Sequence, residues 1–245
     1  MPHAPFVHLR VRSCYSLLES TVRLERLLER CQRDQAPAVA ITDRGNLFCA
    51  LEFSQAAARA GVQPIIGCLL PIASDDLRGN GRPPAPSLLP VLVQNEAGYG
   101  NLLRLLSRAH LQGDPGAAPE LALDALAHAS EGLIALAGGT GGPIGRALLA
   151  GNRELAEALV GQLAQAFADR FYVELMRHGL DDEERIEPAL IEIALKHDLP
   201  LVATNDAHFI DREEYEAHDV LLCISDGAQV AQTERRRLTQ EHRLK

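Results

Sequence analysis

Two residues that close a predicted strand have the types and spacing needed for chemistry. Asp206 and His208 stand two apart in "TNDAH", at the end of the apolar run at 199–205. On an extended chain both side chains point to one face, where a carboxylate and an imidazole together could reach a metal ion or a phosphate group. The same pair is also typical of buried polar side chains that hydrogen-bond to their surroundings. The spacing alone leaves both interpretations open.

Charged residues also lie on or directly after two earlier strands. In "FVHLRVRS" the alternation puts Arg10 and Arg12 on one face of an extended chain. In "AITDRGN", Asp43 and Arg44 end the next strand; the competing interpretation is a turn in which Asp43 or Asn46 caps the following helix. Arginine stays protonated and has no lone pair to donate, so none of these guanidinium groups is a metal ligand.

Several common catalytic signatures are absent from the sequence. The glycine-rich stretch at 138–145 is not followed by Gly-Lys-Ser/Thr, which excludes a Walker loop, and there is no G-x-S-x-G motif. The cysteines are odd in number, lie far apart and form no C-x-x-C pair, so we expect packing residues and neither a disulfide framework nor a zinc ribbon. They are Cys14, Cys31, Cys49, Cys68 and Cys223.

The elements that position these residues alternate along the chain. Short apolar runs predict seven strands, at 6–11, 38–42, 64–67, 89–94, 132–138, 171–175 and 199–205. Helical periodicity is present at 22–32, 50–61, 100–111, 152–169 and 182–198. Such alternation predicts a parallel sheet covered by helices, and seven units suggest closure into a barrel with its site at the carboxyl ends of the strands. The glycine- and proline-rich stretch at 74–87 is predicted to be a surface loop.

Composition limits the class of protein. The chain has 24 basic and 33 acidic residues and a net charge of −9, so any contact with nucleic acid has to be local or supplied by a partner. The N-terminus lacks the apolar segment of a signal peptide, and no run is long and apolar enough for a membrane span. We therefore expect a soluble cytoplasmic protein.

Five stretches in order resemble one family. "FVHLRVRSCYSLLES", "PAVAITDRGNLFCALEFSQAAARAGVQPIIGC", "GYGNLLRLLSRAHL", "LPLVATNDAHF" and "EAHDVLLCI" resemble the N-terminal polymerase-and-histidinol-phosphatase (PHP) domain of bacterial replicative DNA polymerase α subunits. The match runs from about residue 5 to residue 240. The resemblance implies an α/β fold, a distorted seven-stranded (β/α)7 barrel of PHP type.

The resemblance also implies where a metal site would lie. Metal-binding members open it with an H-x-H strand, which matches Arg10 and Arg12, while the histidine of their "TDHGN" block matches Arg44. The nine ligand positions of the family match Arg10, Arg12, Glu19, Arg44, Leu69, Leu88, Gly139, Asp206 and His208. Only Glu19, Asp206 and His208 keep a ligand type, so we predict a vestigial cleft with no metal ligands and no catalytic residues.

The arginines are predicted to replace the positive charge of the lost metal ions. We expect Arg10, Arg12 and Arg44 to form ion pairs with Glu19 and Asp206, because guanidinium groups satisfy carboxylates that are buried. A competing interpretation is an anion pocket for a phosphate or nucleotide, since three guanidinium groups bind oxyanions.

The resemblance implies that these residues are one domain of a larger polymerase subunit. Residues 1–225 are expected to form the PHP domain, and 226–245 the start of a linker toward a polymerase body. The expected role is a structural module that docks the proofreading exonuclease subunit and meets primer-template DNA only through the full polymerase. No cofactor is expected in this segment, whereas the body would use Mg²⁺. The alternatives are a stand-alone metal-dependent PHP phosphoesterase, similar to histidinol phosphatase, and a barrel scaffold of unrelated function.

Overall fold

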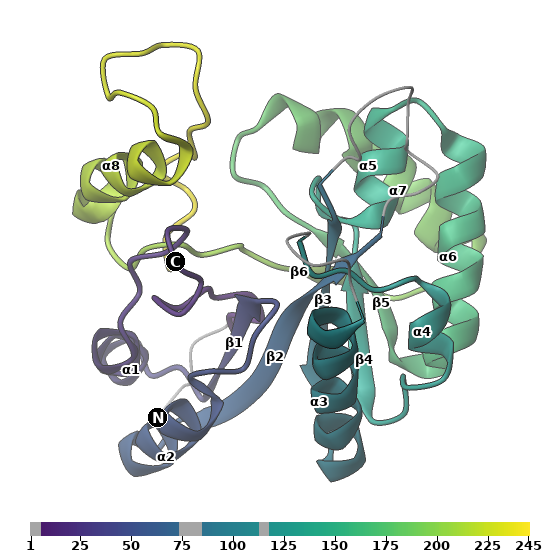
Figure 1. Ribbon diagram of the computed structural model, residues 1–245, viewed down its shortest axis with the longest axis horizontal. Coiled ribbons are helices and arrows are strands. Elements are labelled where there is room, and N and C mark those ends of the chain that lie inside the picture. Colours follow the sequence, from purple (N-terminus) through teal and green to yellow (C-terminus); the bar gives the residue numbers. More distant parts are fainter. Residues whose placement is uncertain (1–5, 74–84, 113–117) are drawn as a thin grey trace. The chain divides into compact units, whose positions relative to one another are not determined.

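The computed structural model describes residues 6–73, 85–112 and 118–245. The chain has an α/β fold whose six strands form one sheet in the order β1-β2-β3-β4-β5-β6 (Figure 1). Two compact units divide it: unit 1 comprises residues 1–67, 177–180 and 204–245, and unit 2 comprises 68–176 and 181–203. Within the described residues no helix has the length and apolar character to cross a membrane.

Unit 1 is built around one apolar core. Its elements are α1 (Leu24–Arg33), β1 (Ala38–Arg44), α2 (Ala50–Ala60), the first half of β2 (Gln63–Ile72), the short 3-10 helix η3 (Arg212–Glu214) and α8 (Tyr215–Asp226). Leu27 of α1, Ile41 of β1 and Phe53 of α2 are buried in that core. The last turn of α2 ends at Gly61, whose φ of 72° is the left-handed geometry that glycine adopts without strain.

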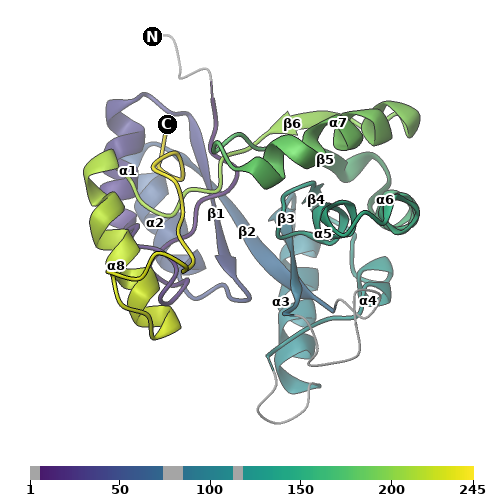
Figure 2. The same ribbon diagram turned by 90° about the horizontal axis from the view of Figure 1, so that it is seen from above.

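Unit 2 is a layer of strands on which helices pack (Figure 2). Besides the rest of β2 it contains β3 (Ser87–Val93), α3 (Glu96–Leu111), α4 (Asp124–Ala127), β4 (Leu133–Ala137), α5 (Pro143–Leu149), α6 (Arg153–Phe167), η2 (Ala168–Arg170), β5 (Phe171–Leu175), α7 (Asp181–Lys196) and β6 (Leu201–Ala203). Asparagine side chains cap two of the helices. Asn95 accepts a hydrogen bond from the Gly98 amide, and Asn152 accepts one from the Leu155 amide.

Six of the seven predicted strands and all five predicted helices form. The remaining run, 6–11, makes only isolated bridges, His8 with Val39 and Val11 with Ala207. The Ala40 amide donates to the His8 carbonyl at 2.8 Å on one side, and the Ala207 amide donates to the Arg10 carbonyl at 3.1 Å on the other. This segment is therefore extended between β1 and residue 207. Closure into a seven-stranded barrel stays a prediction, and most of the loop predicted at 74–87 lies outside the described residues.

The prediction of a wholly parallel sheet is wrong at one pair. β3 and β4 are antiparallel, with Val93 opposite Leu133, whereas β4–β5 and β5–β6 are parallel. After α3 and α4 the chain returns to the carboxyl end of β3 and begins β4 there. The hydrogen bond from the Gln94 amide to the Gly132 carbonyl joins the two strands at that end. Gly98 and Gly132 touch so closely there that an added Cβ on either would clash with backbone. Helical periodicity indicates that a helix joins two strands, but it does not indicate at which end the chain re-enters.

Residues after α8 belong to unit 1. The His208 amide donates to the His242 carbonyl, and the Leu244 amide donates to the Phe209 carbonyl at 3.1 Å, so the segment 242–245 runs alongside residues 208–209. Leu244 is 2% exposed in the core of unit 1. The Arg235 guanidinium makes two 2.6 Å hydrogen bonds to Asp219 of α8. The domain boundary at 225 stays a prediction, but residues 239–245 pack as part of unit 1.

We expect Leu244→Ala to lower the free energy of unfolding by about 2–3 kcal/mol, because it removes a buried leucine side chain and leaves a cavity. Truncation after Ser225 should cost more, since it also removes the hydrogen bonds to residues 208 and 209. Urea unfolding followed by circular dichroism measures both. Leu195→Ala is the matched control, because Leu195 is 74% exposed. Equal stability of the two leucine variants would show that the segment does not contribute to unit 1.

Candidate functional site

The extended segments 8–12 and 204–208 place four charged or polar side chains together in unit 1. The bridge between Val11 and Ala207 turns these two residues into the core. Because side chains alternate along an extended chain, Arg10 and Arg12 point away from the core, as do Asp206 and His208. The four side chains therefore come from the two ends of the sequence and meet on one face.

Asp206 is held by two guanidinium groups. Arg12 binds it in a bidentate manner, with Nε 3.1 Å from Oδ1 and Nη2 2.8 Å from Oδ2. The Nη2 atom of Arg10 lies 3.0 Å from the same Oδ2 atom. Paired hydrogen bonds between a guanidinium and a carboxylate are among the strongest polar contacts in proteins.

Glu19 is the second carboxylate of the cluster and bridges two arginines. Its Oε2 accepts from Nη1 of Arg12 and its Oε1 accepts from Nη1 of Arg44, each at 2.5 Å. Arg44 is the last residue of β1. The structure thus brings Arg10, Arg12, Arg44, Glu19 and Asp206 into one network, which we call the arginine cluster.

The arginine cluster is largely shielded from water. The side chains of Arg10, Arg12, Glu19 and Asp206 are 6%, 10%, 12% and 12% exposed, whereas that of Arg44 is 40% exposed. Burial alone would raise the pKa of Asp206, but the charges of Arg10 and Arg12 hold that pKa well below its usual range. Arg12 and Arg44 likewise lower the pKa of Glu19 against the effect of burial. Both carboxylates are ionised at neutral pH.

Asp43 fixes the loop that leads from Arg12 to Glu19. Its Oδ1 accepts from the Ser13 amide and the Ser16 hydroxyl, both at 2.7 Å. Its Oδ2 accepts from the Ser13 hydroxyl at 2.6 Å and from the Cys49 thiol at 3.2 Å. The prediction that Asp43 or Asn46 caps α2 is wrong, because Cys49 holds the N-cap position without a side-chain cap bond. Sequence reasoning missed this role, since the serines are 27 and more positions away.

Four buried histidines of unit 1 form a chain of contacts that begins at the Glu19 carbonyl. The Glu19 carbonyl accepts from Nδ1 of His208 at 2.8 Å and from Nε2 of His218 at 2.9 Å. The rings of His178 and His242 are stacked with centroids 3.9 Å apart. Burial lowers the pKa of His218 to about 4 and that of His242 to about 3. His218 lies in the stretch "EAHDVLLCI" that resembles the family, whereas no sequence motif marks His178 or His242.

The remaining three predicted positions belong to unit 2. Leu69 is fully buried in β2, and the amide of Leu88 in β3 donates to the Gly141 carbonyl at 2.9 Å. The amide of Gly139, which follows β4, donates to Glu174 Oε1 at 3.3 Å. None of these three residues has a side chain that could coordinate a metal ion.

The residues at the positions that the family resemblance implies do not fit a metal centre. Guanidinium groups occupy three of these implied positions, and they repel cations. In residues 6–73, 85–112 and 118–245, no group of three or more His, Cys, Asp and Glu side chains is arranged to hold a metal ion. The arrangement can bind carboxylates, and its chemistry is that of ion pairing.

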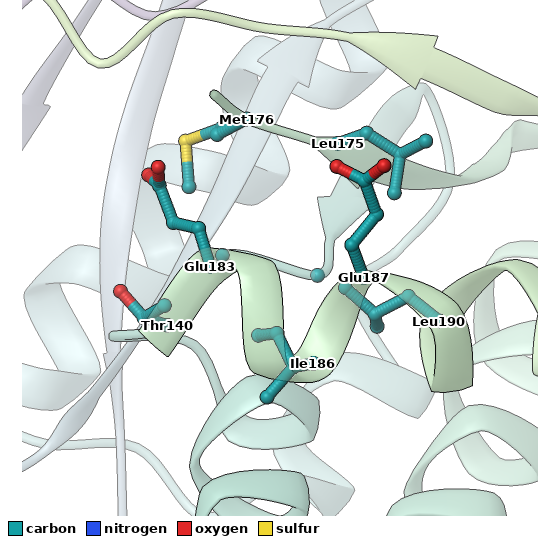
Figure 3. A pocket seen from close by; sticks show the side chains of 9 residues that line it. Thr140, Leu175, Met176, Glu183, Ile186, Glu187 and Leu190 are labelled. Carbon is teal, nitrogen blue, oxygen red and sulfur yellow. The ribbon is translucent and has the colours of Figure 1, made fainter. Parts of the chain in front are cut away.

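A small hollow lies in unit 2 beyond the carboxyl ends of β4 and β5. Figure 3 shows Glu183 and Glu187 of α7 projecting from the helix toward Met176 and Leu175. The hollow has a volume of about 10 Å³, which is room for about one water molecule. The hollow is therefore too small to bind a substrate.

Comparison with known proteins identifies the chain's relatives. It is 48% identical to the DNA polymerase III subunit alpha of Caulobacter vibrioides over 98% of this chain and 21% of that protein. It is 39% identical to the same subunit of Escherichia coli K12 over 93% of this chain and 19% of that protein. The chain thus spans about a fifth of the length of the curated relatives that it matches.

Solved structures share the fold at low identity. A protein from Bifidobacterium adolescentis assigned as a metal-dependent phosphoesterase superposes with a TM-score of 0.54 at 14% identity, over 85% of this chain and 89% of that one. An amidohydrolase from Chromobacterium violaceum superposes with a TM-score of 0.51 at 16% identity, over 82% of this chain and 87% of that one. The family model described as "PHP domain" matches residues 8–178. With that match and the polymerase relatives in agreement, the chain belongs to the PHP domain family.

Proposed function

We propose that this chain is the N-terminal PHP domain of a cytoplasmic replicative DNA polymerase III α subunit, and that by itself it is a structural module without hydrolytic activity. The observation that carries this proposal is the bidentate pairing of Arg12 with Asp206. The family resemblance implies a histidine at the position of Arg12 in metal-binding members. The identity to polymerase α subunits over nearly the whole chain supports the assignment of the parent protein.

The guanidinium groups of the arginine cluster would supply the positive charge that metal ions supply in metal-binding members. Asp206 and Glu19 carry two negative charges in a site shielded from water, and such charges are costly unless they are paired. Three guanidinium groups supply the counter-charge through fixed hydrogen bonds. These bonds tie segment 8–12 to Asp206 and Glu19, and they tie Glu19 to Arg44. As the seventh strand of the proposed barrel, segment 8–12 would be held in place by these pairs.

Catalysis would belong to the rest of the parent protein. We place nucleotide addition, Mg²⁺ and the contact with primer-template DNA in a polymerase body of the same chain, with residues 226–245 leading toward it. The net charge of −9 supports this division. The three consecutive arginines at 235–237 also support it, because Arg235 is paired with Asp219 and Arg236 with Asp226.

Docking of the proofreading exonuclease subunit is the second part of the proposal. It rests on the family resemblance, and a pull-down of the exonuclease subunit with residues 1–245 tests it directly. If beads that carry residues 1–245 retain no more exonuclease than beads alone, this segment does not dock the exonuclease subunit.

Metal analysis tests the structural role against that of a PHP phosphoesterase. After dialysis against zinc and manganese and a buffer wash, we expect below about 0.1 equivalent of metal by mass spectrometry, because a site of many ligands would retain metal tightly. Phosphatase activity on the same sample should equal the buffer blank. A PHP protein with an intact H-x-H strand is the positive control. One or more retained equivalents with turnover would establish a phosphoesterase instead.

The arginine cluster should contribute strongly to stability. We expect Arg12→Ala to lower the free energy of unfolding by about 3–5 kcal/mol, because it leaves Asp206 and Glu19 short of a buried partner. Arg33→Ala is the matched control, since that side chain is 64% exposed and its ion pairs are worth about 1 kcal/mol or less. Urea titration at pH 7 measures both. An unchanged midpoint for Arg12→Ala would contradict a structural role, and a lost phosphate affinity would favour an anion pocket.

The contribution of Asp206 should depend on pH in one direction. Its pKa in the folded chain lies well below the ordinary 3.8, so its stabilising effect is complete above about pH 4 and is lost as the pH falls further. We therefore expect the free energy of unfolding of Asp206→Asn to be lower than that of the unchanged chain. The difference should be constant between pH 5 and 8, because Asp206 of the unchanged chain stays ionised throughout that range. The margin should narrow below about pH 4. A margin that widens in acid would show that Asp206 is not ionised in the folded chain.

A further inference from the structure

Four large apolar side chains of unit 1 point into solvent within two short segments. Leu17 is 73% exposed and Leu18 is 47% exposed in the loop before Glu19. Phe48 and Leu51, at the start of α2, are 71% and 72% exposed. Single exposed leucines are ordinary on protein surfaces, whereas several together mark interaction sites. We call these four residues the apolar patch.

Hydrogen bonds hold the two segments of the apolar patch side by side. The Arg44 amide donates to the Ser16 hydroxyl, and the Asn46 side-chain amide donates to the Tyr15 carbonyl, both at 3.1 Å. The Tyr15 hydroxyl donates to Glu52 of α2 at 3.0 Å. These hydrogen bonds therefore place the loop before Glu19 beside the start of α2.

The backbone of the loop is held in a conformation that leucine rarely adopts. Leu18 has a φ of 60°, which is uncommon for any residue other than glycine and unfavourable for a bulky side chain. The residues on either side are fixed, because Ser16 donates to Asp43 and Glu19 binds Arg12 and Arg44. The fold thus holds both leucines outward in a pre-formed arrangement, which reduces the entropy lost on binding.

The chemistry of the surface indicates the kind of partner. The basic neighbour Arg44 is already paired with Glu19, and the Glu52 carboxylate accepts a hydrogen bond from the Tyr15 hydroxyl. A surface with large apolar side chains and a paired basic neighbour fits an apolar protein face, and a phosphate backbone would find few partners on it.

The lengths of the relatives favour a partner in the same chain. Four fifths of the Caulobacter relative lies outside the part that matches these 245 residues. Domains of one chain bury surfaces of about 600–1,500 Å² against one another, and four side chains are too few to make a stable dimer interface by themselves.

We propose that the apolar patch packs against the polymerase body of the same α subunit. This inference rests on the proposed function, because it assumes that the body is present in the parent chain. Leu17 and Phe48 would be the main anchors, as the most exposed large side chains of the loop and of the helix start.

Modification of Cys14 reports directly on coverage of the apolar patch. Cys14 is the exposed cysteine of unit 1, three residues before Leu17, whereas Cys31, Cys49 and Cys223 are buried. We expect a maleimide to modify Cys14 at least tenfold more slowly in the full α subunit than in residues 1–245, measured by peptide mass spectrometry. Leu17→Ser/Phe48→Ser should restore the fast rate in the full subunit. Leu111→Ser, at a leucine that is 82% exposed on α3, is the matched control and should not.

Each other outcome assigns a different occupant and overturns the proposal. An equal rate in both proteins leaves the apolar patch uncovered. A rate that slows only after the exonuclease subunit is added assigns the patch to that subunit, and a rate in residues 1–245 that falls with concentration assigns it to a second copy. Metal retention by residues 1–245 would overturn the proposed structural role without changing the Cys14 rate, so the two failures are distinguishable.

Discussion

A carboxylate that is removed from water needs positive charge and hydrogen-bond donors, and Asp206 obtains both from the guanidinium group of Arg12. This contact joins residues 194 positions apart, and it lies beside the bridge that joins Val11 to Ala207. The packing of unit 1 depends on it, because the same two segments carry core residues on their opposite face. Any residue that replaces Arg12 has to balance the charge of Asp206 on one face of these segments. It also has to preserve the distance between Val11 and Ala207 on the opposite face.

Three shells of contacts surround that pair. Glu19 and Arg44 extend the ion pairs to the end of β1, Asp43 fixes the connecting loop, and two histidines hold the carbonyl of Glu19. Each shell uses a different chemistry: buried ion pairs, a carboxylate that accepts from hydroxyl and amide groups, and imidazole rings that donate to a carbonyl. Because every shell contacts the segment 12–20, that segment has little freedom to rearrange around a bound ion.

Much of the fold could be predicted from local pattern. Apolar runs and helical periodicity located β1 through β6 and the helices α1, α2, α3, α6 and α7, because those signals reside in neighbouring residues. The 12-residue helix α8 was not predicted. The short α5 follows a glycine-rich stretch and carries no such signal, and the antiparallel return at Gly132 depends on a contact between two distant glycines. Among the candidate residues, the side chains of Arg12 and Asp206 could be grouped by the family resemblance. His178 and His242 could not, since their stacking follows only from the path of the chain after α8.

The composition of unit 1 from three separate stretches of chain has a consequence for synthesis on the ribosome. Residues 1–67 complete their core only with Ala207, Ile210 and Leu244. Unit 2, by contrast, is complete once residue 203 has emerged. Contacts of such long sequence separation form slowly, because the loop between them must close first. Unit 2 can therefore fold during translation while the first 67 residues wait, with their apolar side chains exposed, until the C-terminal stretch arrives to close the second core.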